Sequence, residues 1–402
     1  MKAPSALLAR QPIFDRGLKV AGYEILFRAE SGWLTQMASP DNLTAEVGIH
    51  ALLDLGLDRI VGNRPVWINI PRNVLVSGIF EFFPPERVVL ELLETVEADE
   101  EVLRAVRHAR SLGFKIALDD FVLNSNTQDL VPLADYVKLD VLASDEAGLR
   151  SAAAKLARPG LQLLAEKVET HASFQLATGL GCSLFQGYFF ARPQLVECRR
   201  VHNNRLALLR VVAELQDEKT SIERIEELIR SDVGLSYRLM RYVNSVGIGT
   251  LAPIESLRHA IMTLGMERVR ACVLVLMLTA YDDKPDELVT TSLVRARYCQ
   301  LLCEFHGLDG KRGFLVGLLS AIDAFLDRTI ESIVREMGLA EELAVALIRH
   351  EGELGLVLEA AIACERADWE GLSRSHYGDA PEDTYLAALS WSAQMQSSLA
   401  GP

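Results

Sequence analysis

The sequence lacks the features that mark several common classes of protein. Six scattered cysteines in 402 residues form no disulfide framework, which favours a reducing cytoplasm. Acidic residues outnumber basic ones by 55 to 41 and give a net charge of -14, whereas a general nucleic-acid binder needs basic surface. The longest apolar run, residues 271–280, is about half of the ~20 residues that a membrane span requires, and residues 1–15 lack an apolar core as long as that expected of a signal peptide. We therefore expect a cytoplasmic protein that neither crosses a membrane nor binds nucleic acid directly.

Seven short apolar runs in the first half of the chain each end in polar residues that suit a metal or a phosphate. The runs are GYEILFR, PVWINI, RVVLELLE, FKIALDDF, DYVKLD, LQLLAEKVE and SLFQGYFF, and their polar ends are Glu24, Asn69, Glu91, Asp119 with Asp120, Lys138, Glu166 and Gln186. Helix-like stretches separate most of the runs, which predicts a parallel β/α fold. When such strands close into a barrel, their C-terminal ends converge where active sites lie. Because crowded carboxylates repel one another, we expect a divalent cation among them.

The chain opens with an exception to this alternation. The runs LLARQPIFD and VAGYEILF are separated only by Arg16, Gly17, Leu18 and Lys19. So short a link predicts an antiparallel hairpin. The expected fold is therefore an α/β TIM-like barrel in which one strand runs against the others.

The pattern changes after Arg192 and Pro193. We expect a barrel domain over residues 1–195, a polar linker over 196–205 and an all-α domain over 206–402. Residues 220–223 (TSIE) read as a capping box before a helix, and apolar residues at helical spacing continue through 257–264, 268–278, 293–305 and 314–325.

The polar strand ends of the first half resemble the motifs of the EAL domain, a cyclic-di-GMP phosphodiesterase module. EILFR from Glu24 to Arg28 resembles the Glu-Ala-Leu-x-Arg signature, and the remaining motifs follow in the family's order over residues 7–193. They are Asn69, Glu91 in ELLE, Asp119 with Asp120, Lys138 in KLD, Glu166 and Glu169 in AEKVE, and Gln186 in QGY.

The resemblance implies a role for each of these residues. One Mg²⁺ or Mn²⁺ ion would be held by Glu24, Asn69, Glu91 and Asp119, and a second by Asp119, Asp120 and Glu166. Such hard oxygen ligands suit these ions, and two ions suit phosphodiester hydrolysis. The implied catalytic residues are Lys138, Glu166 and Gln186, and the implied substrate-binding residues are Arg28 and Gln11.

The chain departs from the family pattern at two places. After Asp120 and Phe121 the family has Gly and small hydroxyl residues, but here Val122 follows, and valine resists the positive φ that glycine accepts. Lys167 replaces the Gly of AEGVE, so a cation stands beside Glu166 and could pair with that carboxylate or with a ligand phosphate. Both changes bear on turnover while leaving the expected metal ligands in place.

The second half resembles the HDOD domain, a relative of HD metal phosphohydrolases that lacks their catalytic residues. The matching segments are VNS at 243–245, IESLRHAIMTLG at 254–265 and GLL at 317–319. HD enzymes carry a His-Asp pair near GLL, where this chain has Ser320 and Ala321, and Asp323 cannot replace that pair. The resemblance implies a regulatory module that binds a protein partner.

Several residues have alternative explanations. Asn69 could cap the helix that begins near Pro71, and Glu169 could be a loop anchor or a surface charge. Lys138 could form a Schiff base, although surrounding carboxylates would keep it protonated. The helix face formed by Cys299, Cys303 and His306 could bind zinc, but buried thiols packed as small apolar groups are the favoured explanation.

Two functions follow from these observations. The altered loop after Asp120 slightly favours a non-catalytic or weakly active barrel that acts in cyclic-di-GMP signalling through its HDOD module. The retained ligands support the alternative, a metal-dependent phosphodiesterase that opens cyclic-di-GMP to linear pGpG. A homodimer is compatible with either function, and an aldolase-like enzyme is a remote third class.

Overall fold

The computed structural model describes residues 6–29, 56–119, 128–191 and 284–400 apart from 338 and 382, together with the isolated residues 221, 223, 224, 227, 259 and 273. Contacts between Cα atoms divide the chain into two compact units. The first comprises residues 1–190 with 363–373 and 381–386, and the second comprises the remainder. The predicted boundaries at 195 and 206 stay predictions.

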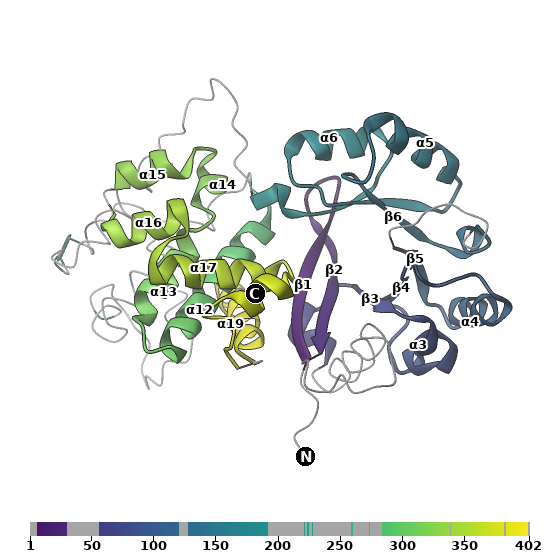
Figure 1. Ribbon diagram of the computed structural model, residues 1–402, viewed down its shortest axis with the longest axis horizontal. Helices are drawn as coiled ribbons and strands as arrows, with labels where there is room; N and C mark the ends of the chain where they lie inside the picture. Colours follow the sequence, from purple (N-terminus) through teal and green to yellow (C-terminus); the bar gives the residue numbers. More distant parts are fainter. Residues whose placement is uncertain are drawn as a thin grey trace, which may run out of the picture. The chain divides into compact units, whose positions relative to one another are not determined.

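The first unit contains a closed barrel of eight strands in sequence order (Figure 1). The strands are β1 (Ala6–Asp15), β2 (Val20–Ala29), β3 (Val66–Ile70), β4 (Val88–Leu92), β5 (Lys115–Leu118), β6 (Tyr136–Asp140), β7 (Gln162–Glu166) and β8 (Leu184–Gln186). Strand β1 pairs antiparallel with both β2 and β8, and the other neighbours are parallel. The predicted barrel with one reversed strand is therefore confirmed.

Helices connect the parallel strands and lie outside the barrel (Figure 1). They are α2 (Leu57–Val61), α3 (Arg72–Ser77), η2 (Ile79–Phe82), α4 (Glu100–Ser111), η3 (Val131–Leu133), α5 (Glu146–Leu156) and α6 (His171–Gly179), and η4 (Tyr188–Ala191) follows the last strand. The side chains of Asp99 and Asp145 accept backbone N–H bonds at the starts of α4 and α5, and Thr170 forms a capping box before α6. These caps satisfy N–H groups that the first helical turn leaves unpaired.

The barrel interior holds an apolar layer to which almost every strand contributes. This layer consists of Ile13, Trp67, Val89, Ala117, Tyr136, Leu164 and Leu184, all buried. Strand β2 contributes Gly22, where an added Cβ would lie 2.1 Å from the Trp67 ring. The absence of a side chain at Gly22 therefore leaves room for the largest member of the layer. Side chains alternate between the two faces of a strand, so the next inward position on each strand lies two residues away.

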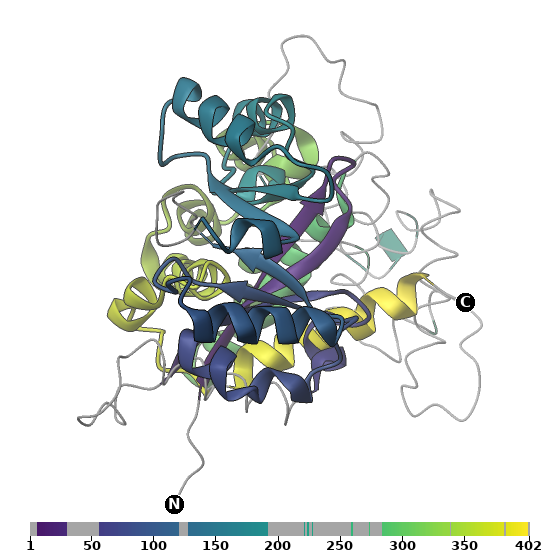
Figure 2. The same ribbon diagram turned by 90° about the vertical axis from the view of Figure 1, so that its right-hand side faces the viewer.

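The hairpin between β1 and β2 is the long pair of purple strands in Figure 2. Residues 16–19 join the two strands, and the Asp15 N–H donates to the Lys19 carbonyl at 2.9 Å. Leu18 has a φ of 59° in this turn. The predicted antiparallel hairpin is confirmed.

The described part of the second half is helical. Its helices are α12 (Asp286–Phe305), α13 (Gly310–Leu319), α14 (Ile322–Leu326), α15 (Ile330–Met337), α16 (Glu341–Arg349), α17 (Gly352–Glu365), α18 (Trp369–Arg374) and α19 (Asp383–Ala400). The apolar stretch at 314–325 is not one helix, because α13 ends at Leu319 and the Ser320 hydroxyl bonds back to the Gly317 carbonyl. The predicted capping box at 220–223 and the predicted helices at 257–264 and 268–278 fall outside the described residues, isolated positions apart. None of the helices described is both long and apolar enough to cross a membrane.

Candidate functional site

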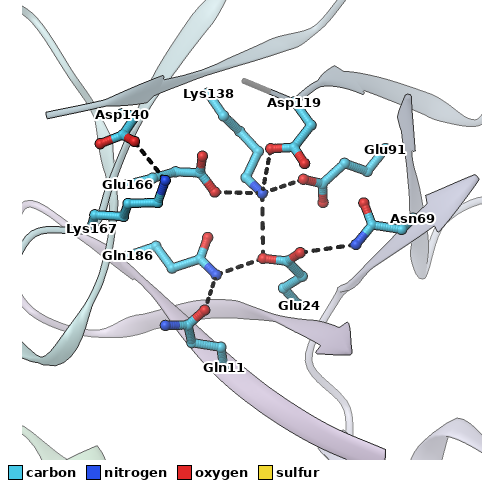
Figure 3. Close-up of polar contacts among 10 residues, drawn as sticks. All are labelled: Gln11, Glu24, Asn69, Glu91, Asp119, Lys138, Asp140, Glu166, Lys167 and Gln186. Atoms are coloured by element: carbon cyan, nitrogen blue, oxygen red, sulfur yellow. Dashed lines mark hydrogen bonds and ion pairs between the residues drawn. The ribbon is translucent and has the colours of Figure 1, made fainter. Parts of the chain in front are cut away.

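The polar strand ends form a second inward layer directly beyond the apolar layer of the barrel. Each parallel strand carries its candidate two residues after its apolar member, as in Trp67 and Asn69 on β3 or Leu164 and Glu166 on β7. The full polar layer is Glu24, Asn69, Glu91, Asp119, Lys138, Glu166 and Gln186, with Gln11 from the reversed strand. Because these positions share one face and one end of the barrel, their side chains converge (Figure 3).

The ammonium group of Lys138 lies at the centre of this layer. Its Nζ is 3.3 Å from Glu24 Oε2, 3.1 Å from Asp119 Oδ1 and 2.6 Å from Glu166 Oε1, and it also contacts Glu91 Oε1. The Lys138 side chain is only 1% exposed. Four carboxylates therefore share one buried cation, and the site carries excess negative charge when all five groups are ionised.

Amide side chains fix the orientation of Glu24. Asn69 Nδ2 donates to Glu24 Oε1 at 3.1 Å, and Gln186 Nε2 donates to Glu24 Oε2 at 2.6 Å and to Gln11 Oε1 at 2.7 Å. Asn69 does not cap the following helix, since the N-cap of α3 is Pro71 and no side chain accepts a bond there. The capping explanation for Asn69 is wrong because its amide turns inward to the carboxylate.

Burial and mutual repulsion shift the pKa values of these groups. Burial raises the pKa of Glu166 to about 8, although Lys138 opposes the shift. Burial and the neighbouring Glu24 raise the pKa of Glu91 well above its usual value. Burial alone would lower the pKa of Lys138, but the surrounding carboxylates outweigh it and raise the pKa. Lys138 is therefore a charged ammonium, which argues against the Schiff-base alternative.

The site has oxygen atoms suited to a hard divalent cation. Ligand oxygens of Glu24, Glu91 and Glu166 all lie within 4.8 Å of one another. Within the described residues, the buried Asn69 Oδ1, Glu91 Oε2 and Gln186 Oε1 have no hydrogen-bond partner. A buried oxygen without a partner is costly, and a cation would satisfy it. The donor set therefore fits Mg²⁺ or Mn²⁺.

Some predicted site residues lie beyond what the structure describes. Asp120, Phe121 and Val122 fall in the gap at 120–127, and the side chain of Arg28 is likewise outside the description. Glu169 is described and exposed, one residue before the cap of α6.

Lys167 pairs with Asp140, a partner that its place beside Glu166 in the sequence did not indicate. Its φ is 54°, in the left-handed region that favours glycine. Its Nζ forms an ion pair with Asp140 Oδ2 at 2.6 Å (Figure 3). Sequence reasoning did not single out Asp140, although it stands at the end of β6 two residues after Lys138. That spacing was the available signal.

In the helical half, Ser320 and Asp323 form hydrogen bonds within the helical domain. Ser320 Oγ donates to the Gly317 carbonyl at 2.7 Å and lies 3.1 Å from Arg295 Nη1. The Asp323 carboxylate accepts from the Ala324 N–H at 2.9 Å, and burial raises the pKa of Asp323 to about 6.

The thiol face of α12 is packed against α13. Cys299 and Cys303 are buried and form no disulfide, and a Cβ at Gly313 would lie 2.6 Å from Cys303 Sγ. Burial raises the pKa of Cys303 to about 12, which disfavours the thiolate that zinc requires. His306 Nε2 is 3.2 Å from Asp379 Oδ1. These contacts support packing rather than a zinc site.

Comparison with known proteins gives consistent matches in both halves. A family model for the EAL domain matches residues 74–193, and one for the HDOD domain matches residues 206–349. The chain is 33% identical over 377 residues to a Vibrio cholerae protein named cyclic di-GMP phosphodiesterase CdgJ, covering 91% of this chain and 86% of that protein. It is 30% identical to the uncharacterized protein YuxH of Bacillus subtilis, with 96% and 97% coverage. A similar solved structure is Klebsiella pneumoniae BlrP1 in a calcium/cy-diGMP complex, with 23% identity, a TM-score of 0.39 and coverage of 47% and 55%.

Proposed function

The chain belongs to the EAL–HDOD family of cyclic-di-GMP signalling proteins, and from this premise we propose that its barrel is a metal-dependent phosphodiesterase that hydrolyses cyclic-di-GMP to linear pGpG. One observation carries this proposal. Polar side chains from all eight strands or their ends converge around the Lys138 ammonium, whose Nζ lies within 3.3 Å of carboxylate oxygens from four residues. The relative named cyclic di-GMP phosphodiesterase, which matches 91% of this chain, supports the same activity.

The proposed ligands follow from the oxygens that face the centre of the site. Glu24, Asn69, Glu91 and Asp119 would hold one Mg²⁺ or Mn²⁺ ion, and Asp119, Asp120 and Glu166 would hold a second. Bound ions would generate the attacking hydroxide and stabilise the negative charge that develops on the phosphate.

The chain's own residues orient the reactants. The Lys138 ammonium can donate up to three hydrogen bonds and would hold the attacking water or a phosphate oxygen. The Gln186 and Asn69 amides hold the Glu24 carboxylate through hydrogen bonds of 2.6 and 3.1 Å. Hydrolysis adds water across one P–O bond of the cyclic dinucleotide. One ribose of the linear product then carries a terminal phosphate, and the other ribose carries a free hydroxyl.

A non-catalytic cyclic-di-GMP switch is the second candidate. It is favoured by Val122, which stands where the family has glycine, and by Lys167, which occupies a left-handed conformation in another glycine position of the motif. In this case the barrel would bind nucleotide without turnover. In either case the HDOD half would engage a protein partner, and the protein could act as a homodimer.

The test is incubation of the purified full chain with cyclic-di-GMP in Mn²⁺, Mg²⁺ or EDTA, followed by chromatography for pGpG. We expect product with either metal and none in EDTA. The variant Glu24→Gln should lower the rate by on the order of 10²-fold, because it disturbs the groups that align the reacting atoms. Glu86→Gln, which neutralises an exposed glutamate, is the matched control and should leave the rate unchanged. Nucleotide binding without product in either metal would support the switch instead.

A further inference from the structure

We propose that Lys167 is a positioning residue of the metal site, which braces the end of strand β7 against Asp140 and thereby aims the Glu166 carboxylate. The inference rests on the proposed function for its biological meaning, but its first readout is metal affinity alone. It concerns a residue that departs from the family motif.

The backbone at Lys167 is held in a conformation that lysine adopts at a cost. Its φ of 54° brings Cβ close to the backbone, and only glycine takes this region without penalty. Strained conformations persist where the surroundings determine them. A side-chain contact that fixes Lys167 is therefore expected, and the ion pair with Asp140 is such a contact.

Asp140 is well placed to receive this brace. Its Oδ2 lies 2.6 Å from Lys167 Nζ, and its Oδ1 accepts the Leu142 N–H at 2.7 Å. The Asp140 side chain is 13% exposed, against 52% for Lys167. Asp140 also pairs with Glu166 in the register of β6 and β7. The ion pair consequently joins the ends of two neighbouring barrel strands.

The residue before Lys167 belongs to the site, and the residue after it bonds to the backbone of another site residue. Glu166 contacts Lys138 at 2.6 Å, and the Val168 N–H donates to the Gln186 carbonyl at 2.9 Å. An added Cβ at Gly187 would lie 2.1 Å from the Val168 carbonyl oxygen, so the ends of β7 and β8 touch. A change in the backbone at Lys167 would therefore move Glu166 and also disturb the hydrogen bond between Val168 and Gln186.

If Lys167 were only a solvated surface charge, its removal would change the affinity for a divalent cation in the opposite direction. Removing one positive charge near a cluster of carboxylates should strengthen the binding of a divalent cation. Loss of a positioning contact should weaken it, since removing partners that orient metal ligands typically costs 10–100-fold in affinity. Because Lys167 is half exposed, we expect an effect at the lower end of that range.

The experiment is calorimetric titration of the full chain with MnCl₂. Lys167→Met should weaken Mn²⁺ binding by about tenfold, and Lys167→Arg, which can keep the ion pair, should stay within about twofold. Lys167→Gly should lose less than Lys167→Met because glycine relieves the backbone strain. Lys155→Met removes an exposed lysine of α5 and is the matched control, with no change expected.

A double-mutant cycle tests the partner. Asp140→Asn should also weaken Mn²⁺ binding, and the double variant should be no weaker than Lys167→Met, because both changes break the same contact. Losses that multiply, or Mn²⁺ binding by Lys167→Met as tight as in the unmodified chain, would overturn the inference. Far-ultraviolet circular dichroism confirms that each variant is folded.

The outcome separates this inference from the proposed function. If the unmodified chain hydrolyses cyclic-di-GMP while Lys167→Met keeps full Mn²⁺ affinity, the inference alone fails. If the cycle shows coupling but no pGpG forms, the phosphodiesterase proposal alone fails. If the unmodified chain binds no Mn²⁺, both are overturned.

Discussion

Replacing Lys138 by methionine should destabilise the metal-free barrel strongly and in a pH-dependent way. Methionine has a similar length but no charge, so the variant keeps much of the volume while removing the only cation contacting Glu24, Glu91, Asp119 and Glu166 among the described residues. Removing one partner of a buried ion pair costs about 3–5 kcal/mol. For a unit of this size that corresponds to a fall of roughly 6–20 °C in the melting temperature of the barrel.

The cost should depend on pH because the carboxylates can take up protons in place of the lysine charge. At pH 6 Glu166, whose pKa is already raised to about 8, is largely protonated, so Lys138→Met should cost less than at pH 8.5. Mn²⁺ should restore stability at either pH, by about 2.7 kcal/mol at 100 times its Kd.

The assay is urea unfolding in EDTA and in Mn²⁺, with hydrogen exchange of β6 peptides reporting on the barrel. Lys155→Met, on the exposed face of α5, controls for the loss of a lysine and should change stability by less than about 0.5 kcal/mol. A Lys138→Met variant within about 1 kcal/mol of the unmodified chain in EDTA at pH 8.5 would refute the role of Lys138 as the shared counter-ion.

Three further predictions concern other parts of the molecule. In EDTA, stability should fall as pH rises from about 4.5 to 8, because folded Glu166 binds a proton that the unfolded chain has released; Glu166→Gln should flatten the slope measured by urea unfolding, and an unchanged slope would exclude this assignment. Val122→Gly with small residues after it should raise the rate of pGpG formation, Glu24→Ala should abolish that gain, and an inert loop variant that still binds nucleotide would exclude the loop as the limit. Metal analysis of the full chain bearing Glu24→Ala and Glu91→Ala should find no tightly held zinc; zinc that is lost on Cys299→Ser would contradict the packing explanation of the thiol face.

The sequence predicts the barrel and its polar layer because both follow from local patterns. Apolar runs of strand length end in polar residues, and the strand ends of a barrel share one face. The link of four residues between the first two runs is short enough to predict the reversed strand. The apolar layer of the barrel interior follows from the same pattern. Trp67 and Asn69, like Tyr136 and Lys138, are two residues apart and so share one face of a strand.

What the sequence does not predict depends on side chains that meet only in the folded chain. Lys167 stands next to Glu166 in the sequence, yet its left-handed backbone carries its ammonium to Asp140. Asparagine is a residue type that often caps helices, but in the folded chain the Asn69 amide donates to the Glu24 carboxylate instead. The stretch at 314–325 keeps helical periodicity although Ser320 ends α13, because periodicity records burial rather than the continuity of a helix.

The most direct test of the phosphodiesterase proposal is hydrolysis of cyclic-di-GMP by the full chain in ¹⁸O-labelled water with Mn²⁺, followed by mass spectrometry. The proposed chemistry predicts linear pGpG with one ¹⁸O atom in its terminal phosphate and no product in EDTA. Intact cyclic dinucleotide recovered from a complex with the folded, Mn²⁺-loaded protein would contradict it.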